Sequence, residues 1–425
     1  MEVRPAASIP VTSLLSESLP EKRFSKRLPP SVDGCVPFSR MQPLPPEVHK
    51  LLCVRLDTMG DVLMTGPALR ALRGAAPDRR VTLLTSGPGA GVAALMPEVD
   101  DTIVYEAPWL KRERTSDPDG DRQMIAALRE RAFDAAVIFT VYTQSPLPAA
   151  LLCHLAGVPL RGAHCRENPY GLLSHWVAER EPNHTVRHEV RRQLDLAAAL
   201  GARARDERLA VALPEEARAR AADALKKAGV DRDAPWAVVH PGATAASRRY
   251  PEDLWALACR ALADEHDLRL VFTGDSAEVA VAERVRRLAG DPGPSLAGRL
   301  RLADLAALLE AAPLLLAGNT GPVHLAAAVG TPVVDVYALT NPQHAPWMVP
   351  SRVLYQDVPC RWCYSSICRE GHHRCLLDVT PEQIVTAALD LLAGRPQPEV
   401  VLPPVPAGWE ARPPRDFVKE AAWRG

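Results

Sequence analysis

The sequence predicts an α/β fold made of two Rossmann-like halves, and three observations support this prediction. The chain has 425 residues, more than the roughly 250 to 300 residues at which a single hydrophobic core stops growing. Short apolar runs alternate with helix-like segments, as in a doubly wound parallel sheet. The alternation stops near residue 146 and begins again near residue 234. We therefore expect two domains.

The first half is expected to span residues 48–205. Apolar runs predict strands at 51–56, 81–85, 102–106 and 135–140. The turn 57–61 lies between the first run and a helix-like segment, which is the opening β-turn-α unit of such a fold. From 146 to 200 the pattern becomes mostly helical, and the polar stretch 161–171 predicts a loop at a surface or cleft.

The second half is expected to span residues 206–395. Apolar runs predict its strands within 234–242, 268–275, 312–321 and 331–340, and the segment 380–394 reads as a helix. Two proline-rich segments flank the halves: a disordered leader, 1–47, and a tail, 396–425. Met41 is an alternative start of the protein.

Composition excludes several classes of protein. Hydrophobic residues make up 47% and charged residues 24% of the chain, which is ordinary for a folded soluble protein. The 50 lysines and arginines nearly balance 51 aspartates and glutamates, so nucleic acid is not an expected partner. No apolar run is long enough to span a bilayer or to form a signal peptide. We therefore expect a cytoplasmic protein without a transmembrane segment.

Ligands of open α/β sheets bind beyond the carboxyl ends of the strands, so the turns there are candidate functional sites. In the first half, Asp61 stands where the helix begins, and Gly60 permits a tight turn. Two interpretations remain open for Asp61. Its carboxylate caps the helix, or it acts as a general base that takes the proton of a sugar hydroxyl.

Three turns of the second half suit an anion. In the first, the flexible backbone of Gly242 and the arginine fork of Arg248 favour a diphosphate, although Arg248 can equally be a solvated surface charge. In the second turn, Glu278 can accept hydrogen bonds from ribose hydroxyls, or its negative charge can simply favour the start of a helix. In the third, Asn319 and His324 flank a helix start, where His324 can face a ligand or be a buried structural histidine.

Three turns suited to an anion lie in the second half, and one candidate acid lies in the first. This division predicts donor binding in the second half, acceptor chemistry in the first, and a cleft between them. A hydride-transfer enzyme would carry a GxGxxG motif after its first strand, and the sequence DTMGDVLMTG lacks it.

Four cysteines crowd together near the end of the second half: Cys360, Cys363, Cys368 and Cys375. With His372 and His373 among them, they are candidate ligands of a small structural zinc site. The spacing does not follow a common zinc-finger pattern. Packing thiols and redox-dependent disulfides are the alternatives.

Three stretches of the chain resemble glycosyltransferase family 9, the heptosyltransferases: VRLDTMGDVLMTGPALRAL, VVHPGATAASRRYPEDLWALA and LLLAGNTGPVHLAAAVGTPVVDVYALTNP. The similarity runs from about Leu51 to Leu392. It implies a GT-B fold with two Rossmann-like domains facing a cleft. It also implies an inverting transfer of heptose or a similar sugar from an ADP-activated or other nucleotide sugar. The implied acceptor is a glycan or glycolipid such as lipopolysaccharide core, whose lipid can hold the enzyme at a membrane.

The resemblance also implies roles for individual residues, and no metal or other cofactor is needed for the chemistry. Asp61 matches the catalytic base. The donor-binding residues it implies are Thr244 and Arg248, which hold the diphosphate, Glu278, and the phosphate-binding turn with Thr320, Gly321 and His324. Two positions depart from the family pattern: Asn319 stands where many members have aspartate, and Arg248 where lysine is usual. The identity of the donor sugar therefore stays open.

Two rival functions remain. A sugar-nucleotide epimerase of GT-B fold would keep the same donor half without needing Asp61 as a base. A non-catalytic protein that binds nucleotide sugars or a metal would have the cysteine cluster as its working part.

Overall fold

The structure is a computed structural model that describes residues 42–110, 117–182, 186–395 and 402–403. The predicted leader lies outside the described residues as far as Met41, and the predicted tail does so except for residues 402–403. Residues 42–47 are part of the first half, because Leu44 is buried there and its backbone N–H donates to the Leu200 carbonyl at 3.0 Å. The folded chain therefore begins before residue 48.

The first half is a six-stranded parallel sheet with strand order β3-β2-β1-β4-β5-β6. This is the strand order of a Rossmann fold. Its strands are β1 (Lys50–Arg55), β2 (Arg80–Thr85), β3 (Asp101–Val104), β4 (Ala135–Ile138), β5 (Leu160–Cys165) and β6 (His175–Ala178). Its helices are α1 (Met59–Gly74), α2 (Gly87–Ala93), α3 (Pro118–Arg131), α4 (Leu147–Leu155), the short η2 (Tyr170–Leu172) and α5 (Glu189–Ala199).

The second half is a five-stranded parallel sheet with strand order β11-β10-β9-β7-β8. Its strands are β7 (Trp236–His240), β8 (Arg269–Phe272), β9 (Leu315–Gly318), β10 (Val333–Val336) and β11 (Ser351–Leu354). Its helices are α6 (Glu215–Lys227), η3 (Ala246–Arg248), α7 (Glu252–Asp264), α8 (Val279–Leu288), α9 (Leu302–Ala311), α10 (Gly321–Val329), α11 (Arg374–Leu377) and α12 (Pro381–Leu392). The prediction of an α/β protein with two Rossmann-like halves is confirmed.

One prediction about the first half is wrong. The stretch from 146 to 200 is not mostly helical, because β5 and β6 complete the sheet there, and residues 161–165 of the predicted loop are a strand. Arg161 on β5 is buried, and its guanidinium donates to the backbone carbonyls of Leu172 at 2.7 Å and Gly171 at 2.9 Å. A polar side chain that satisfies its hydrogen bonds inside the protein hides the apolar pattern of a strand.

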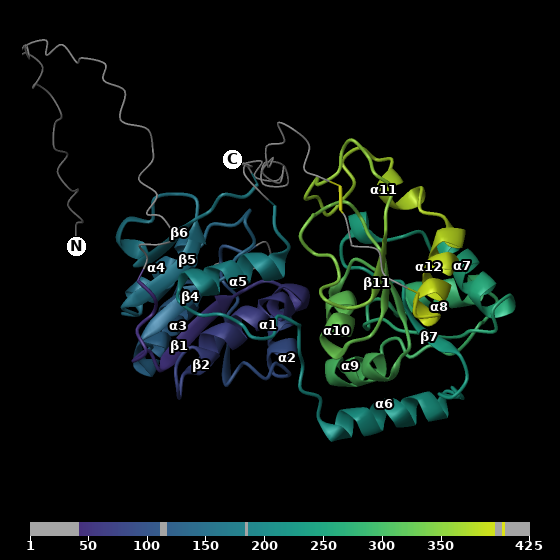
Figure 1. Ribbon diagram of the computed structural model, residues 1–425, viewed down its shortest axis with the longest axis horizontal. Helices are drawn as coiled ribbons and strands as arrows, with labels where there is room; N and C mark the ends of the chain where they lie inside the picture. The colour runs from purple at the N-terminus through teal and green to yellow at the C-terminus, as the bar shows by residue number, and fades with distance from the viewer. Residues whose placement is uncertain (1–41, 111–116, 183–185, 396–401, 404–425) are drawn as a thin grey trace, which may run out of the picture.

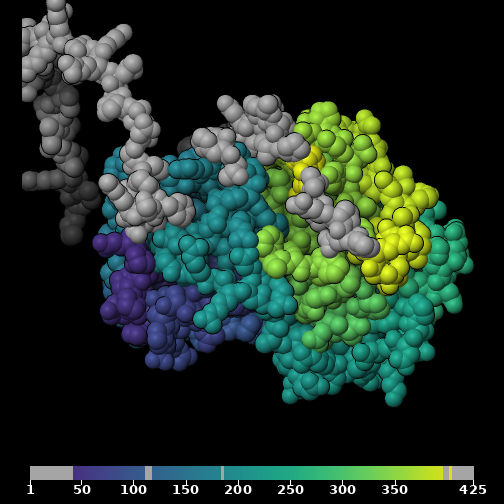
Figure 2. Space-filling view, viewed as in Figure 1, coloured from purple at the N-terminus to yellow at the C-terminus, as the bar shows by residue number. Residues whose placement is uncertain are grey.

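The two halves are packed against each other, as Figures 1 and 2 show. Helix α1 of the first half contacts α10 of the second, and buried side chains from both helices, such as Leu63 and Val323, belong to one hydrophobic cluster. Since each helix follows the carboxyl end of a strand, this contact brings the ligand-binding edges of the two sheets together.

Candidate active site

Asp61 lies at the contact between the halves, in the first turn of α1. Its Oδ2 accepts hydrogen bonds from the backbone N–H of Thr58 at 3.3 Å and from the Thr58 hydroxyl at 2.9 Å. The N-cap residue of α1 is therefore Thr58 and not Asp61, which caps the helix as the N3 residue of a capping box. Its Oδ1 faces away from the cap and accepts from Arg55 Nη2 at 3.2 Å. Capping uses one carboxylate oxygen, so the other is still available for chemistry.

Arg55 is the cation at the centre of this region, and its side chain is fully buried at the end of β1. Three acids surround it: Asp57 Oδ2 lies 3.0 Å from Nε, Asp61 Oδ1 lies 3.2 Å from Nη2, and Glu189 Oε1 lies 2.9 Å from Nη1. Burial by itself would raise the pKa of Asp61, but Arg55, with help from His344 and Thr58, lowers that pKa to about 2. Asp61 is therefore ionised at neutral pH.

Two histidines of the second half face Asp61. His344 Nε2 lies 3.7 Å from Asp61 Oδ1, and the rings of His324 and His344 are 6.2 Å apart. Burial lowers the pKa of each histidine to about 3, even though Asp61 acts in the opposite direction. Both imidazoles are consequently neutral at physiological pH. His324 is buried, but its Nδ1 has no hydrogen-bond partner among the described residues, so it is not a histidine satisfied by the backbone.

Two glycines lie at the contact between α1 and α10. A Cβ atom at Gly60 would lie 2.7 Å from His324 Cδ2, which is closer than real side chains approach. A Cβ atom at Gly321 would overlap the methyl group of Met59. The obstacle at Gly60 is a buried imidazole ring, whereas at Gly321 it is the end of a flexible side chain, so the close approach of the two helix starts depends most on Gly60.

Arg248 is a half-buried cation whose guanidinium forms no hydrogen bond or ion pair with the described residues, although it lies close enough to the buried carboxyl of Asp335 to oppose the rise of its pKa. It lies close enough to the two histidines to contribute to the lowered pKa of each. A cavity of about 230 Å³ adjoins it and is lined by Ala245, Arg248, Thr340, Asn341, Tyr364, Ser365 and Ser366. An unpaired guanidinium beside a cavity of this kind suits an anionic ligand.

The start of α10 offers further unused hydrogen-bonding atoms. Thr320 is the N-cap residue of α10, and its hydroxyl has no hydrogen-bond partner among the described residues. The Nδ2 of Asn319, whose residue is only 2% exposed, makes no hydrogen bond of normal length, although the side chain lies close enough to the Tyr337 hydroxyl to lower its pKa. Buried polar atoms are rarely left unsatisfied in folded proteins, so these two atoms are suited to contact a ligand.

Glu278 and Thr244 lie apart from the Asp61 region. Glu278 Oε2 accepts the backbone N–H of Asp275 at 3.0 Å and lies 3.2 Å from His240 Nε2. Gly242 makes room for this carboxylate, because a Cβ atom there would overlap it. Thr244 is exposed. The structure thus brings Asp61, His324 and Arg248 together and groups Glu278 with His240.

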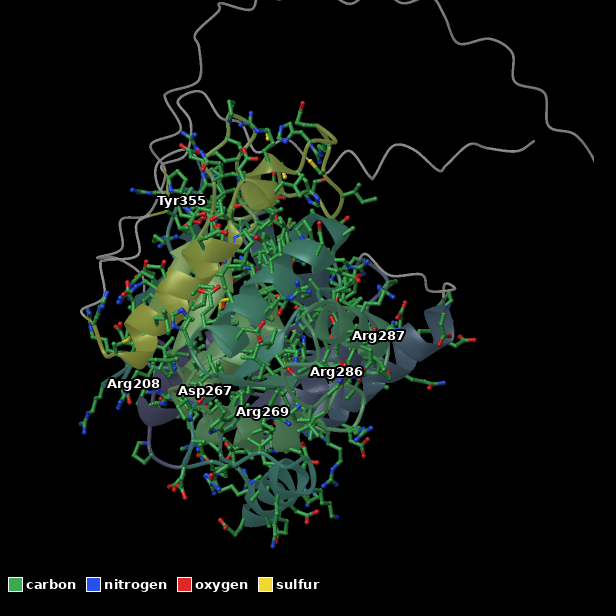
Figure 3. All side chains as sticks on the ribbon, turned by 90° about the vertical axis from the view of Figure 1, so that its right-hand side faces the viewer. Arg208, Asp267, Arg269, Arg286, Arg287 and Tyr355 are labelled. Atoms are coloured by element: carbon green, nitrogen blue, oxygen red, sulfur yellow. The ribbon has the colours of Figure 1, made fainter. Side chains whose placement is uncertain are left out.

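Three other basic side chains of the second half, Arg269, Arg286 and Arg287, lie at the opposite end of the sheet. Arg269 begins β8, and Arg286 and Arg287 lie in the last turn of α8, on the face turned toward the viewer in Figure 3. Because α8 runs back from the carboxyl end of β8, these charges belong to the amino-end edge of the sheet. They are far from the turn that carries Arg248.

The four clustered cysteines line a cavity of about 400 Å³ together with His372 and His373. Cys360 Sγ lies 3.6 Å from His372 Nε2, and the backbone N–H of His373 donates to Cys368 Sγ at 3.4 Å. Nevertheless, no three His, Cys, Asp or Glu side chains in the described part of the chain converge closely enough to hold a metal. All the described cysteines are free thiols. As placed, these side chains do not form a zinc site, and packing thiols and redox-dependent disulfides remain the alternatives.

Sequence reasoning missed several residues of the site. Arg55, Glu189 and His344 all contribute to the surroundings of Asp61, and Asp57 lies in the candidate turn 57–61 but was given no role of its own. The signal that could have revealed Arg55 is its position: a charged residue that ends an otherwise apolar strand needs partners.

Of the helices that the structure describes, none is long and apolar enough to cross a membrane.

Comparisons with known proteins agree with this architecture. The family model described as glycosyltransferase family 9 (heptosyltransferase) matches residues 122–373. The chain is 29% identical over 343 residues to lipopolysaccharide heptosyltransferase 1 of Pseudomonas aeruginosa, which covers 79% of this chain and 92% of the relative.

Two solved structures share the fold, and both are similar over most of their length. A family 9 glycosyl transferase from Veillonella parvula is 21% identical, with a TM-score of 0.70 over 82% of this chain and 98% of that one. The Escherichia coli ADP-heptose lipopolysaccharide heptosyltransferase II is 22% identical, with a TM-score of 0.63 over 81% and 99% of the two chains. The predicted GT-B fold is confirmed by these similarities.

Proposed function

Because this chain belongs to glycosyltransferase family 9 and is a glycosyltransferase of the heptosyltransferase type, we propose that it transfers a heptose from ADP-heptose to a lipopolysaccharide core. Named relatives support both substrates: one is an ADP-heptose lipopolysaccharide heptosyltransferase and another a lipopolysaccharide heptosyltransferase. The acceptor's lipid would bring the enzyme to a membrane surface.

The observation that carries this proposal is the division of charge between the halves. On the second half, Arg248 has no described partner, and Asn319 Nδ2 and Thr320 Oγ1 are unsatisfied. These groups suit the diphosphate and hydroxyls of a nucleotide sugar. On the first half, the ionised carboxylate of Asp61 suits an acceptor hydroxyl.

In the proposed reaction, Asp61 takes the proton of the acceptor hydroxyl as its oxygen attacks the anomeric carbon. The new carbon–oxygen bond forms on the face opposite the diphosphate, so the configuration inverts. The bond from the anomeric carbon to the diphosphate breaks, and the electron pair leaves with ADP. Arg248 and the positive N-terminal end of α10 stabilise the charge that grows on the departing phosphate. No step requires a metal.

The experiment is a transfer assay with purified protein, ADP-heptose and a heptose-deficient core acceptor, compared with other nucleotide sugars. Asp61→Asn should lower kcat by on the order of 100- to 10,000-fold, the usual contribution of a general base. The affinity for ADP-heptose should stay unchanged, because Asp61 acts on the acceptor. Wild-type turnover by Asp61→Asn would refute the assignment of Asp61 as the base. If transfer occurs with another nucleotide sugar and not with ADP-heptose, the proposed donor is wrong.

A further inference from the structure

Asp57 and Asp61 share one edge of a single guanidinium. Arg55 Nε lies 3.0 Å from Asp57 Oδ2, and Arg55 Nη2 lies 3.2 Å from Asp61 Oδ1. Since Nε and Nη2 are neighbouring nitrogens on the same side of the guanidinium, the two carboxylates lie side by side. The third nitrogen, Nη1, is taken by Glu189 at 2.9 Å. One positive charge thus faces three carboxyl groups and can balance only one.

We propose that Asp57 is a positioning residue for the base, whose own charge determines whether Asp61 can accept the acceptor's proton; this inference rests on the proposed function. While Asp57 is ionised, its negative charge offsets the pull of Arg55 and keeps Asp61 basic. When Asp57 takes up a proton, Arg55 acts on Asp61 without that opposition. Asp61 then remains ionised but becomes a weaker base, and transfer slows.

The groups around Asp57 come from several elements of the first half. Gln144, in the loop after β4, donates Nε2 to Asp57 Oδ1 at 2.8 Å. The hydroxyl of Ser86, between β2 and α2, donates to the Asp57 backbone carbonyl at 2.7 Å. The charged groups facing the carboxylate are Arg55 on β1, Asp61 on α1 and Glu189 on α5. On the second half, His324 and His344 act on Asp61.

These surroundings give the two acids different pKa values. Burial, reinforced by Asp61 and Glu189, raises the pKa of Asp57 to about 6 against the opposing effects of Arg55 and Gln144. The pKa of Asp61 stays at about 2. On acidification Asp57 therefore takes up a proton first, and Asp61 is still ionised when it does so. Transfer should decline below about pH 6, far above the pH at which the base itself is protonated.

The chain offers two matched variants that distinguish which acid sets this decline. Gln144→Ala removes a donor to Asp57, and Gln144 is exposed, so the fold should be kept. Thr58→Val removes the hydroxyl that donates to Asp61 at 2.9 Å. If Asp57 sets the decline, Gln144→Ala raises the pH at which transfer declines by roughly half a unit, the equivalent of one modest hydrogen bond. Thr58→Val should leave the pH of this decline unchanged.

The direct variant is Asp57→Asn, which imitates the protonated acid at every pH. We expect the decline near pH 6 to disappear and the plateau of kcat/KM to be roughly tenfold lower, since like charges side by side shift basicity by one or more units. The proposal is overturned if Asp57→Asn keeps the wild-type profile, or if Thr58→Val rather than Gln144→Ala moves the decline.

A titration that needs no turnover separates this inference from the proposed function. In protein carrying ¹³C-labelled aspartate carboxyls, a signal titrating near pH 6 should vanish in Asp57→Asn and move to higher pH in Gln144→Ala. If this titration is seen but no nucleotide sugar is turned over, the proposed function fails while the ordering of the two acids stands. If no such signal exists in the folded protein, the inference fails whatever the enzyme transfers.

Discussion

Arg248 and Arg249 are adjacent arginines with different surroundings. The guanidinium of Arg249 donates to the backbone carbonyls of Ala243 at 2.7 Å and Thr244 at 3.3 Å. That of Arg248 is half-buried and has no partner among the described residues. Because the two arginines carry the same charge at neighbouring positions, variants of each can be compared to test which one binds the donor.

We predict that Arg248→Ala lowers kcat/KM for the donor by roughly 100-fold, as when one group that stabilises a departing oxyanion is removed. Both kcat and donor affinity should fall, because the charge on the diphosphate grows toward the transition state. Arg249→Ala should change either parameter less than threefold. Steady-state kinetics with varied ADP-heptose makes the comparison. Equal losses in the two variants would mean that general surface charge, and not Arg248, attracts the donor.

Sequence reasoning found the residues of the site that follow strand ends and missed those that support them. Asp61, Arg248 and Asn319 could be predicted because polar residues in βα turns face the ligand edge of a parallel sheet. Glu189 could not, because its role depends on Arg55, which lies 134 positions away. His344 lies in a long loop and is recognisable only once the two halves are in contact. Such pairings are set by tertiary packing and leave no local pattern.

At the scale of elements, the cysteine-rich segment (360–375) supports the turn that carries Arg248. The backbone N–H of Ser247 donates to the Ser366 carbonyl at 2.9 Å, and the Ser247 hydroxyl donates to the Ser365 carbonyl at 2.6 Å. Ser247 is buried. The segment is itself anchored where Trp362 and Tyr364 donate their backbone N–H groups to the carbonyls of Leu339 and Thr340.

We predict that Ser247→Ala weakens donor binding by roughly fivefold and costs about 1 kcal/mol of stability, the contribution of one hydrogen bond. Calorimetric titration with ADP-heptose and thermal unfolding give the two values. Thr331→Val is the control, since it removes a comparable bond from a buried hydroxyl to the Leu309 carbonyl, and Thr331 does not line the cavity beside Arg248. If Ser247→Ala loses stability but binds the donor as tightly as wild type, the segment supports the fold and not Arg248.

Strands were predictable where their residues are continuously apolar and less so elsewhere. β1, β2, β7 and β10 are buried along nearly their whole length and read as apolar runs. β5 contains Arg161 and His164, whose guanidinium and Nε2 bond to backbone carbonyls inside the protein, and most of this strand falls in the stretch predicted as a loop. β11 pairs only with β10, at the edge of its sheet, and has a mixed pattern that no prediction covered. Local periodicity fails where burial and polarity coincide.

At the scale of the whole molecule, one loop of the second half joins it to the first. Gln343, between β10 and β11, is fully buried. Its Nε2 donates to Glu181 Oε2 at 2.7 Å and to the Arg187 carbonyl at 3.0 Å, and its own carbonyl accepts from Glu189 N–H at 3.0 Å. Trp347 in the same loop stacks on His188, with ring centroids 4.5 Å apart.

We predict that Gln343→Ala lowers the free energy of unfolding by about 2 kcal/mol, because Glu181 Oε2 is left buried without that donor. Gln343→Glu should be worse than Gln343→Ala, since it sets a second carboxylate against Glu181. Urea denaturation of the three proteins measures the differences. Should Gln343→Glu be as stable as wild type, the side chain does not hold the halves together.

The glycine contacts between α1 and α10 also decide which positions a directed-evolution library can usefully vary. A new side chain at Gly60 or Gly321 would meet His324 or Met59 of the opposite half, so selection for a new donor sugar would mostly discard such variants as misassembled. Asn319 and Thr320 are different, because their Nδ2 and Oγ1 atoms form no hydrogen bond of normal length to the opposite half. A small library confined to those two positions, with both glycines kept, would explore sugar preference while each variant retained the alignment of its two halves.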